Sequence, residues 1–113
     1  MPAKQNPMAA LRQLREGIRD AAQQALRDAL TADAAAQQAL VAAEEAVVAA
    51  QRRLASAKGG AGATISALQQ RERFVSRRRE ELAAEEGRRD AVAAKRREAA
   101  QVVAAKRERL AQA

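Results

Sequence analysis

The chain lacks the residue types on which most catalytic and metal sites depend. Its 113 residues include no cysteine and no histidine, which excludes disulfides, thiol chemistry and the usual ligands of zinc. General acid–base and nucleophilic catalysis most often use these two residue types or a buried pair of carboxylates. The glutamate pairs of this sequence lie among other charged residues, as on a solvated helix face. We therefore expect no enzyme activity and no cofactor.

Aromatic side chains and long apolar runs are also scarce. Phe74 is the only aromatic residue, and most of the 48% hydrophobic residues are alanine. This composition buries too little large apolar surface for a thick globular core, and it is typical of long helices and coiled coils. No apolar run approaches the roughly 20 residues of a membrane span. Residues 1–7 lack the hydrophobic segment of a secretory signal, so we expect a cytoplasmic protein without membrane insertion.

The net charge of +7 is unevenly distributed along the chain. Residues 1–57 carry +1 and residues 58–113 carry +6. A basic second half suits an acidic protein, a nucleic acid or an anionic lipid surface. Acidic residues separate the basic clusters at 77–79, 88–89 and 95–97, and stacking aromatics are missing, which disfavours nucleic acid. The narrow, alanine-rich apolar faces disfavour a helix lying in the membrane surface.

A cluster of glycines divides the chain into two helical arms. Three of the five glycines lie in residues 58–64, and glycine ends helices because it adopts φ > 0 at little cost. Asn6-Pro7 is a good helix start, and Thr64 or Ser66 can cap the second helix. We predict an all-α, two-helix antiparallel coiled-coil hairpin that is monomeric. Its parts are a disordered tail (1–6), a helix (7–57), a Gly-rich turn (58–64) and a helix (65–111).

Heptad spacing predicts the seam between the two arms. In the first helix it comprises Leu11, Leu14, Ile18, Ala22, Leu26, Ala29, Asp33, Ala36, Leu40, Ala43, Val47, Ala50, Leu54 and Ala57. In the second helix one seam position comprises Leu68, Val75, Leu82, Arg89, Arg96, Val103 and Leu110, and the other comprises Glu72, Arg79, Glu86, Ala93, Ala100 and Arg107.

Folding the arms about Ala61 aligns these two stripes in one register. This register pairs Leu54 with Leu68, Val47 with Val75, Leu40 with Leu82, and Asp33 with Arg89. The last pair joins opposite charges, and we expect it to set the register. Its contribution to stability is near zero, because partly buried ions lose hydration.

Phe74 stands out on an arm that is rich in arginine and glutamate. It lies next to the predicted seam residue Val75, so one interpretation is that it flanks the core near the turn. The other is that it is an exposed anchor for a partner, since aromatic residues dominate interface hot spots.

Four stretches carry a resemblance to a known family. They are Ala10-Leu11-Arg12-Gln13-Leu14-Arg15-Glu16, the step Asp20-Ala21-Ala22, Leu40-Val41-Ala42-Ala43-Glu44-Glu45, and the Gly-rich turn followed by Leu68-Gln69-Gln70-Arg71-Glu72-Arg73-Phe74. In these stretches the chain resembles the FliJ/YscO-type stalk proteins of bacterial flagellar and type III secretion export machines.

The resemblance implies a fold, two partners and their sites. Such stalks are antiparallel coiled coils similar to the central stalk of rotary ATPases. They insert their helical ends into the hexameric export ATPase, stimulate it, and reach the cytoplasmic domain of the export gate near the hinge. In this chain the implied gate-facing residues are Leu40, Val41, Glu44 and Phe74. The implied ATPase-facing residues are Leu11, Leu14, Arg96, Arg97, Val103, Arg107 and Leu110. The implied location is the cytoplasm, peripheral to the inner-membrane export apparatus.

Two other functions remain open at this point. A basic coiled coil that binds nucleic acid predicts an affinity that falls steeply with salt. A generic coiled-coil scaffold or chaperone predicts no effect on an export ATPase.

Overall fold

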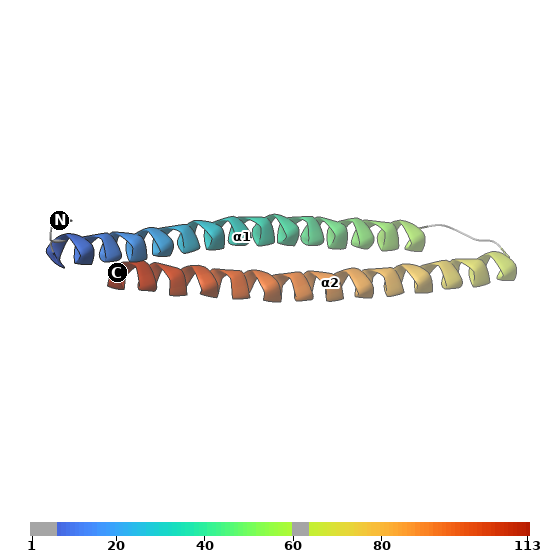
Figure 1. The fold of residues 1–113 in the computed structure, drawn as a ribbon. Coiled ribbons are helices and arrows are strands. Elements are labelled where there is room, and N and C mark those ends of the chain that lie inside the picture. The colour runs from blue at the N-terminus through green and yellow to red at the C-terminus, as the bar shows by residue number, and fades with distance from the viewer. Residues whose placement is uncertain (1–6, 60–63) are drawn as a thin grey trace. The chain divides into compact units, whose positions relative to one another are not determined.

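The chain folds into two long helices. A computed structural model describes residues 7–59 and 64–113, where α1 spans Pro7–Lys58 and α2 spans Ile65–Gln112. The helices run antiparallel (Figure 1), and the described ranges contain no strand. The predicted all-α hairpin is therefore confirmed. The predicted tail at 1–6 and the glycines at 60 and 62 lie outside the described residues.

The contacts divide the hairpin into two compact units. The terminal unit comprises Met1–Ala35 and Arg97–Ala113, and the hinge unit comprises Ala36–Arg96. Each unit therefore contains a stretch of α1 and a stretch of α2.

Thr64 caps the start of α2. Its hydroxyl oxygen accepts a hydrogen bond from the Ala67 N–H at 3.0 Å, and its carbonyl oxygen accepts one from the Leu68 N–H at 3.0 Å. These contacts satisfy two backbone donors that a helix start leaves unpaired. Of the two predicted caps, Thr64 is the one used, and Ser66 lies inside the helix.

The core is thin because alanine provides most of it. The buried apolar residues of the described ranges are Ala22, Ala29, Val47, Ala50, Ala57 and Val103. Four of these six are alanine, whose burial removes little surface from water. From Ala22 to Ala57 every predicted seam position of α1 is buried or half-buried, so that part of the seam is confirmed.

The seam of α2 agrees with the prediction only in part. Val75, Leu82 and Val103 are buried or half-buried as expected, but Leu68 is exposed. Of the predicted alternates, Glu86, Ala93 and Ala100 are half-buried as expected, whereas Glu72, Arg79 and Arg107 are exposed. A neighbouring stripe is half-buried too, and it comprises Arg71, Arg78, Glu85, Val92, Ala99 and Lys106. Long stems at such positions can cover the seam while their charges reach water.

One contact shows that the predicted register is wrong in the hinge unit. Arg53 Nε lies 4.0 Å from Glu81 Oε2. The predicted register places Arg53 level with Gln69, about 18 Å from Glu81 at 1.5 Å per helical residue, and no ion pair spans that distance. The pairs Leu54–Leu68, Val47–Val75 and Leu40–Leu82 are therefore not level with each other.

The Asp33–Arg89 pair was predicted from the same register, so the observed contact removes the argument for it. Asp33 belongs to the terminal unit and Arg89 to the hinge unit. Within its own unit, Arg89 donates hydrogen bonds to Asp90 Oδ1 through Nε and Nη2, each at 3.2 Å.

The observed register leaves the start of α2 projecting beyond α1. With Arg53 beside Glu81, the last residue of α1, Lys58, is level with Ser76. Residues 65–75 therefore extend past the end of α1 for about 16 Å, as Figure 1 shows on the hinge side. We call these residues the hinge overhang.

Gly87 provides a test of helix stability in the hinge unit. A Cβ built at this exposed position meets no atom within 4 Å. Alanine loses less backbone freedom than glycine on folding, so Gly87→Ala should raise the free energy of unfolding by about 1 kcal/mol in urea denaturation. The matched change Ala91→Gly, also exposed on α2, should lower it by a similar amount. Destabilisation by Gly87→Ala would contradict the open environment of this residue.

Candidate functional site

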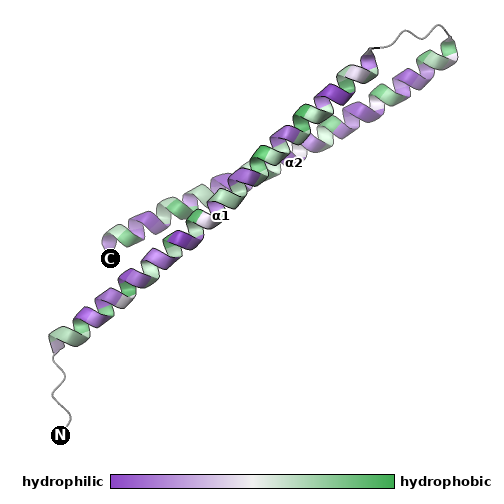
Figure 2. Cartoon of the chain, turned by 90° about the horizontal axis from the view of Figure 1, so that it is seen from above, coloured by the Kyte–Doolittle hydropathy of each residue, from purple (hydrophilic) through white to green (hydrophobic). Residues whose placement is uncertain are grey.

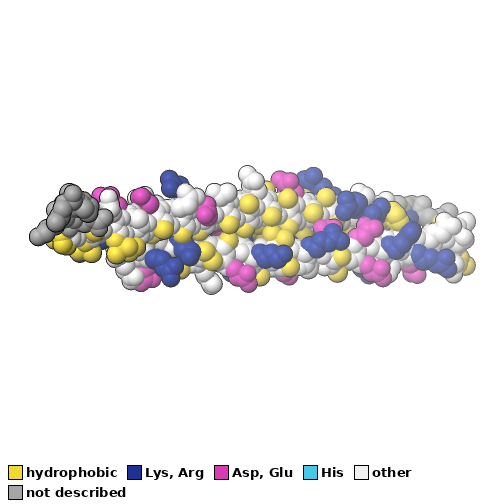
Figure 3. Space-filling view, viewed as in Figure 1, with side chains coloured by type: hydrophobic (Ala, Val, Ile, Leu, Met, Phe, Trp, Pro, Cys, Tyr) yellow, Lys and Arg dark blue, Asp and Glu magenta, His cyan; other side chains and the backbone are white. Residues whose placement is uncertain are grey.

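The first turns of α1 carry a row of large apolar side chains exposed to solvent. It consists of Met8, Leu11, Leu14 and Ile18, whose exposed fractions lie between 42% and 65%. We call it the amino-terminal row, and Figure 3 shows hydrophobic side chains at this end of α1. These residues continue the stripe that forms the seam from Ala22 onward, so their spacing suits packing against a helix.

The row lies where α1 has no described stretch of α2 beside it. In the terminal unit a shallow groove is lined by Ile18, Ala21, Ala22 and Ala25 of α1, and by Arg109, Gln112 and Ala113 of α2. The end of α2 therefore lies beside Ile18–Ala25. Residues 7–17 of α1 continue past it.

The other predicted ATPase-facing residues are in different environments. Arg97 and Arg107 are exposed in the terminal unit, whereas Leu110 is half-buried. Val103 is only 5% exposed and belongs to the core, so it cannot contact a partner in this conformation. Arg96 is half-buried and belongs to the hinge unit. Of the predicted set, only Leu11 and Leu14 form one exposed apolar surface.

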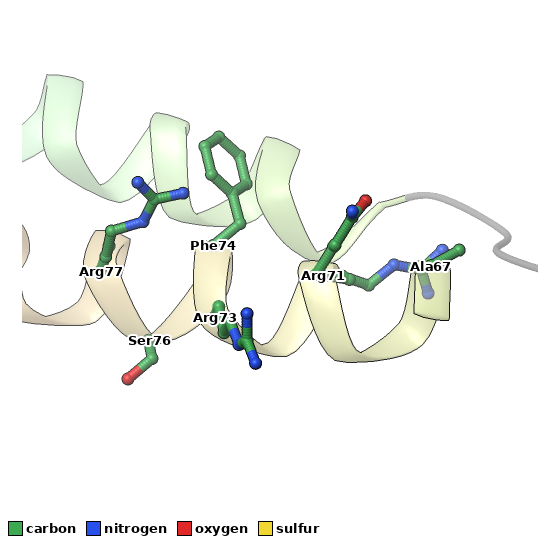
Figure 4. Close-up of a pocket in the computed structure, with 7 residues that line it drawn as sticks. Ala67, Arg71, Arg73, Phe74, Ser76 and Arg77 are labelled. Atoms are coloured by element: carbon green, nitrogen blue, oxygen red, sulfur yellow. The ribbon is translucent and has the colours of Figure 1, made fainter. Parts of the chain in front are cut away.

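Phe74 is an exposed residue of a groove at the hinge end. The groove is lined entirely by α2: Ala67, Gln70, Arg71, Arg73, Phe74, Ser76 and Arg77. Phe74 is 38% exposed. In Figure 4 Phe74 and Arg77 point to the same side of the helix, and Arg73 and Ser76 point away from that side. Phe74 is therefore a surface residue, and its role as an anchor for a partner stays a prediction.

Two arginines fix the Phe74 ring. The guanidinium carbon of Arg78 lies 4.7 Å from the ring centroid, and that of Arg77 lies 5.6 Å from it, both within cation–π range. Arg78 also donates a hydrogen bond of 2.8 Å to Glu81 Oε2. Arg78 thus connects the ring to the carboxylate that lies beside Arg53 of α1.

These contacts change the acidity of Glu81. The hydrogen bond from Arg78 lowers the pKa of the Glu81 carboxyl from its ordinary value of 4.5, and the charges of Arg78, Arg53 and Arg77 act in the same direction. Opposite charges at short range favour the ionised carboxylate.

The predicted gate-facing residues do not form a single surface. Val41 and Glu44 line a groove of α1 together with Glu45, Val48, Ala49 and Arg52, and Leu40 is half-buried. In the observed register Val41 and Phe74 are separated by 19 helical positions, about 28 Å along the hinge unit. The resemblance implied that these residues share a surface near the hinge, and their assignment to the export gate stays a prediction.

The exposure of several residues at the two ends was not predicted. Met8, Ile18, Ile65 and Leu68 are exposed; Ile18 and Leu68 were predicted to lie in the seam, and Met8 and Ile65 were not considered. The residues that extend past the partner helix depend on how the two helices are aligned, and the apolar stripe of one helix does not specify that alignment. For the hinge end, the sequence did contain one indication of a binding surface: residues 50–79 carry eight basic residues and one acidic residue.

Comparisons with known proteins identify no relative of this chain. No family model, no curated protein and no solved structure matches the chain.

Two searches of the described residues were also negative. They contain no group of three or more His, Cys, Asp or Glu side chains placed to hold a metal ion. Neither α1 nor α2 has a stretch long and apolar enough to cross a membrane, and hydrophilic and hydrophobic segments alternate along both helices in Figure 2.

Glu81→Gln should destabilise the hairpin in a pH-dependent way. A carboxyl whose pKa is lowered by folding stabilises the fold above its unfolded pKa, and this stabilisation is lost as the pH falls through the folded value. Glu81→Gln should therefore lower the melting temperature at neutral pH, and this difference should shrink as the pH falls below the ordinary carboxyl value of 4.5. The neighbouring exposed residue provides the control, since Glu80→Gln should change the melting temperature little across the same pH range. Equal losses for the two variants would show that the Arg78–Glu81–Arg53 contacts are not stabilising.

Proposed function

We propose that this chain is a non-enzymatic coupling protein, a helical stalk of a type III export machine, flagellar or virulence-associated. In this role it inserts its helical ends into the hexameric export ATPase, stimulates ATP hydrolysis, and links the ATPase to the export gate. The observation that supports this proposal best is the exposed amino-terminal row at the end that the ATPase would receive.

The spacing of the row supports a protein partner at this end. Leu11, Leu14 and Ile18 recur every three or four residues, so they share one side of α1. Exposed apolar side chains at such positions stabilise a helix only when another surface covers them. A cluster of exposed apolar residues is a common mark of a protein-binding site. Arg12 and Arg15 border the row and would favour acidic groups around the ATPase opening.

The hinge unit offers two separate surfaces for the export gate. One is the α1 groove with Val41 and Glu44, and the other is the groove around Phe74. Val41 and Phe74 lie about 28 Å apart along the unit, so a gate domain that contacts both residues would have to extend along the unit.

The experiment that tests the function is ATP hydrolysis by the purified export ATPase of the same organism, with and without this chain. Stimulation that saturates at a fixed ratio of chain to hexamer supports the stalk. No stimulation and no co-purification would overturn it and leave a scaffold or chaperone role for the hairpin.

Truncating the amino-terminal row should weaken binding of the chain to the export ATPase. The double variant Leu11→Ala/Leu14→Ala should weaken binding to the ATPase at least tenfold, because truncating a buried apolar anchor typically costs more than 1 kcal/mol. Both residues are exposed in the free chain, so helicity measured by circular dichroism should not change. The matched variant is Leu30→Ala, which alters a leucine of the same unit that is 40% exposed and should bind normally. Equal affinities for all three proteins would remove the row from the ATPase site.

A further inference from the structure

The hinge end of the molecule is strongly basic. Residues 50–79 carry one acidic residue, Glu72, and eight basic ones. The basic residues are Arg52, Arg53, Lys58, Arg71, Arg73, Arg77, Arg78 and Arg79. The remainder of the hinge unit, residues 36–49 and 80–96, carries four basic and seven acidic residues. Positive charge is therefore concentrated at the hinge, where Figure 3 shows Lys and Arg side chains close together.

The same end exposes large apolar side chains. Ile65 is 76% exposed, and Leu68 and Phe74 are exposed as well. All three lie in the hinge overhang, where α1 no longer runs beside α2. Exposing an isoleucine and a leucine at a protruding helix end is unfavourable in water, and the surrounding arginines make self-association of two such ends unfavourable too.

We propose that the hinge overhang binds the surface of anionic phospholipid membranes. Cations attract acidic headgroups, and exposed Ile, Leu and Phe side chains enter the boundary between headgroups and acyl chains. Neither element is sufficient alone, and the overhang combines both. This inference is independent of the proposed function, which depends on the opposite end of the hairpin.

The arrangement of the side chains favours lipid over the two other anionic partners. Nucleic acid suits a basic groove with stacking aromatics. It would offer no apolar surface to Ile65 and Leu68, and the Phe74 ring already lies against two guanidinium groups. An acidic protein would be recognised by one face. On and next to the overhang the arginines point in different directions, as Arg73 and the neighbouring Arg77 show in Figure 4. Lipid headgroups surround a helix end that enters the interface, so they can contact arginines on every side of it.

The depth of contact follows from the position of the charges. Arg71 and Arg73 lie six and eight residues after Ile65, about 9 and 12 Å along the helix. Entry of Ile65 and Leu68 into the interface therefore brings these guanidinium groups to the phosphates, within roughly one Debye length at physiological salt.

The first test is co-sedimentation of the full chain with vesicles of phosphatidylcholine, with and without phosphatidylglycerol. The chain should sediment with the anionic vesicles only, and increasing salt should weaken binding without abolishing it, because the apolar contacts are not screened. Equal binding to both vesicles, or to neither, would overturn the proposal. Tighter binding to single-stranded DNA than to anionic vesicles would overturn it in favour of nucleic acid.

Two triple variants separate a local site from general charge attraction. Arg71→Gln/Arg73→Gln/Arg77→Gln removes three charges at the hinge, and glutamine preserves helix propensity. Each cation near an anionic surface contributes roughly fivefold to affinity, so this variant should lose about a hundredfold. The control Arg12→Gln/Arg19→Gln/Arg27→Gln removes three charges from exposed positions of the terminal unit and should lose less than about fivefold. Similar losses in the two variants would refute a site at the overhang.

A fluorescent reporter tests insertion directly, because the chain contains no tryptophan and no tyrosine. The emission of Phe74→Trp should shift to shorter wavelength on adding anionic vesicles, and brominated lipids should quench it. The control Leu30→Trp replaces a side chain of similar exposure, 40% against 38%, in the terminal unit. It should show neither effect. A response from Leu30→Trp and none from Phe74→Trp would place the membrane contact elsewhere.

Discussion

The small size of alanine determines how this hairpin is held together. Four of the six buried residues are alanine, and the remaining seam positions include the stems of Arg71, Arg78 and Lys106. Burial of such side chains contributes far less than burial of leucine or phenylalanine. The fold therefore depends on the length of the two helices, over which many small contributions add up, and on a few polar links such as Arg53 to Glu81. The larger side chains that a thicker core would bury are instead available at the surface.

The register of the helices determines which large side chains remain uncovered. In the terminal unit α2 ends beside Ile18, so Leu11 and Leu14 lie beyond it. In the hinge unit α1 ends level with Ser76, so Ile65 and Leu68 lie beyond it. Each end of the hairpin is thus formed by one helix with an apolar surface of its own. The two surfaces differ in charge, and this difference is the physical basis for assigning them to different partners.

The sequence predicted the helices well and their alignment poorly. Pro7 and Thr64 are strong local signals for a helix start, and the heptad stripe of α1 contains enough Leu and Val to identify its buried side. Register depends on contacts between residues far apart in the sequence, and an alanine opposite an arginine fits almost as well one heptad away. Phe74 was recognised as a distinctive residue, but Ile65 and Leu68 were not, because their exposure follows from the overhang and not from any local pattern.

The alternation of alanine with larger residues also affects how the hairpin responds to load. A seam built from leucines interlocks, and moving one helix past the other requires each side chain to leave its hole. An alanine presents almost no knob, so the resistance to sliding is confined to a few contacts, among them the Arg53–Glu81 link. Away from these contacts, the alanines of the seam therefore do little to hold the two helices in one alignment.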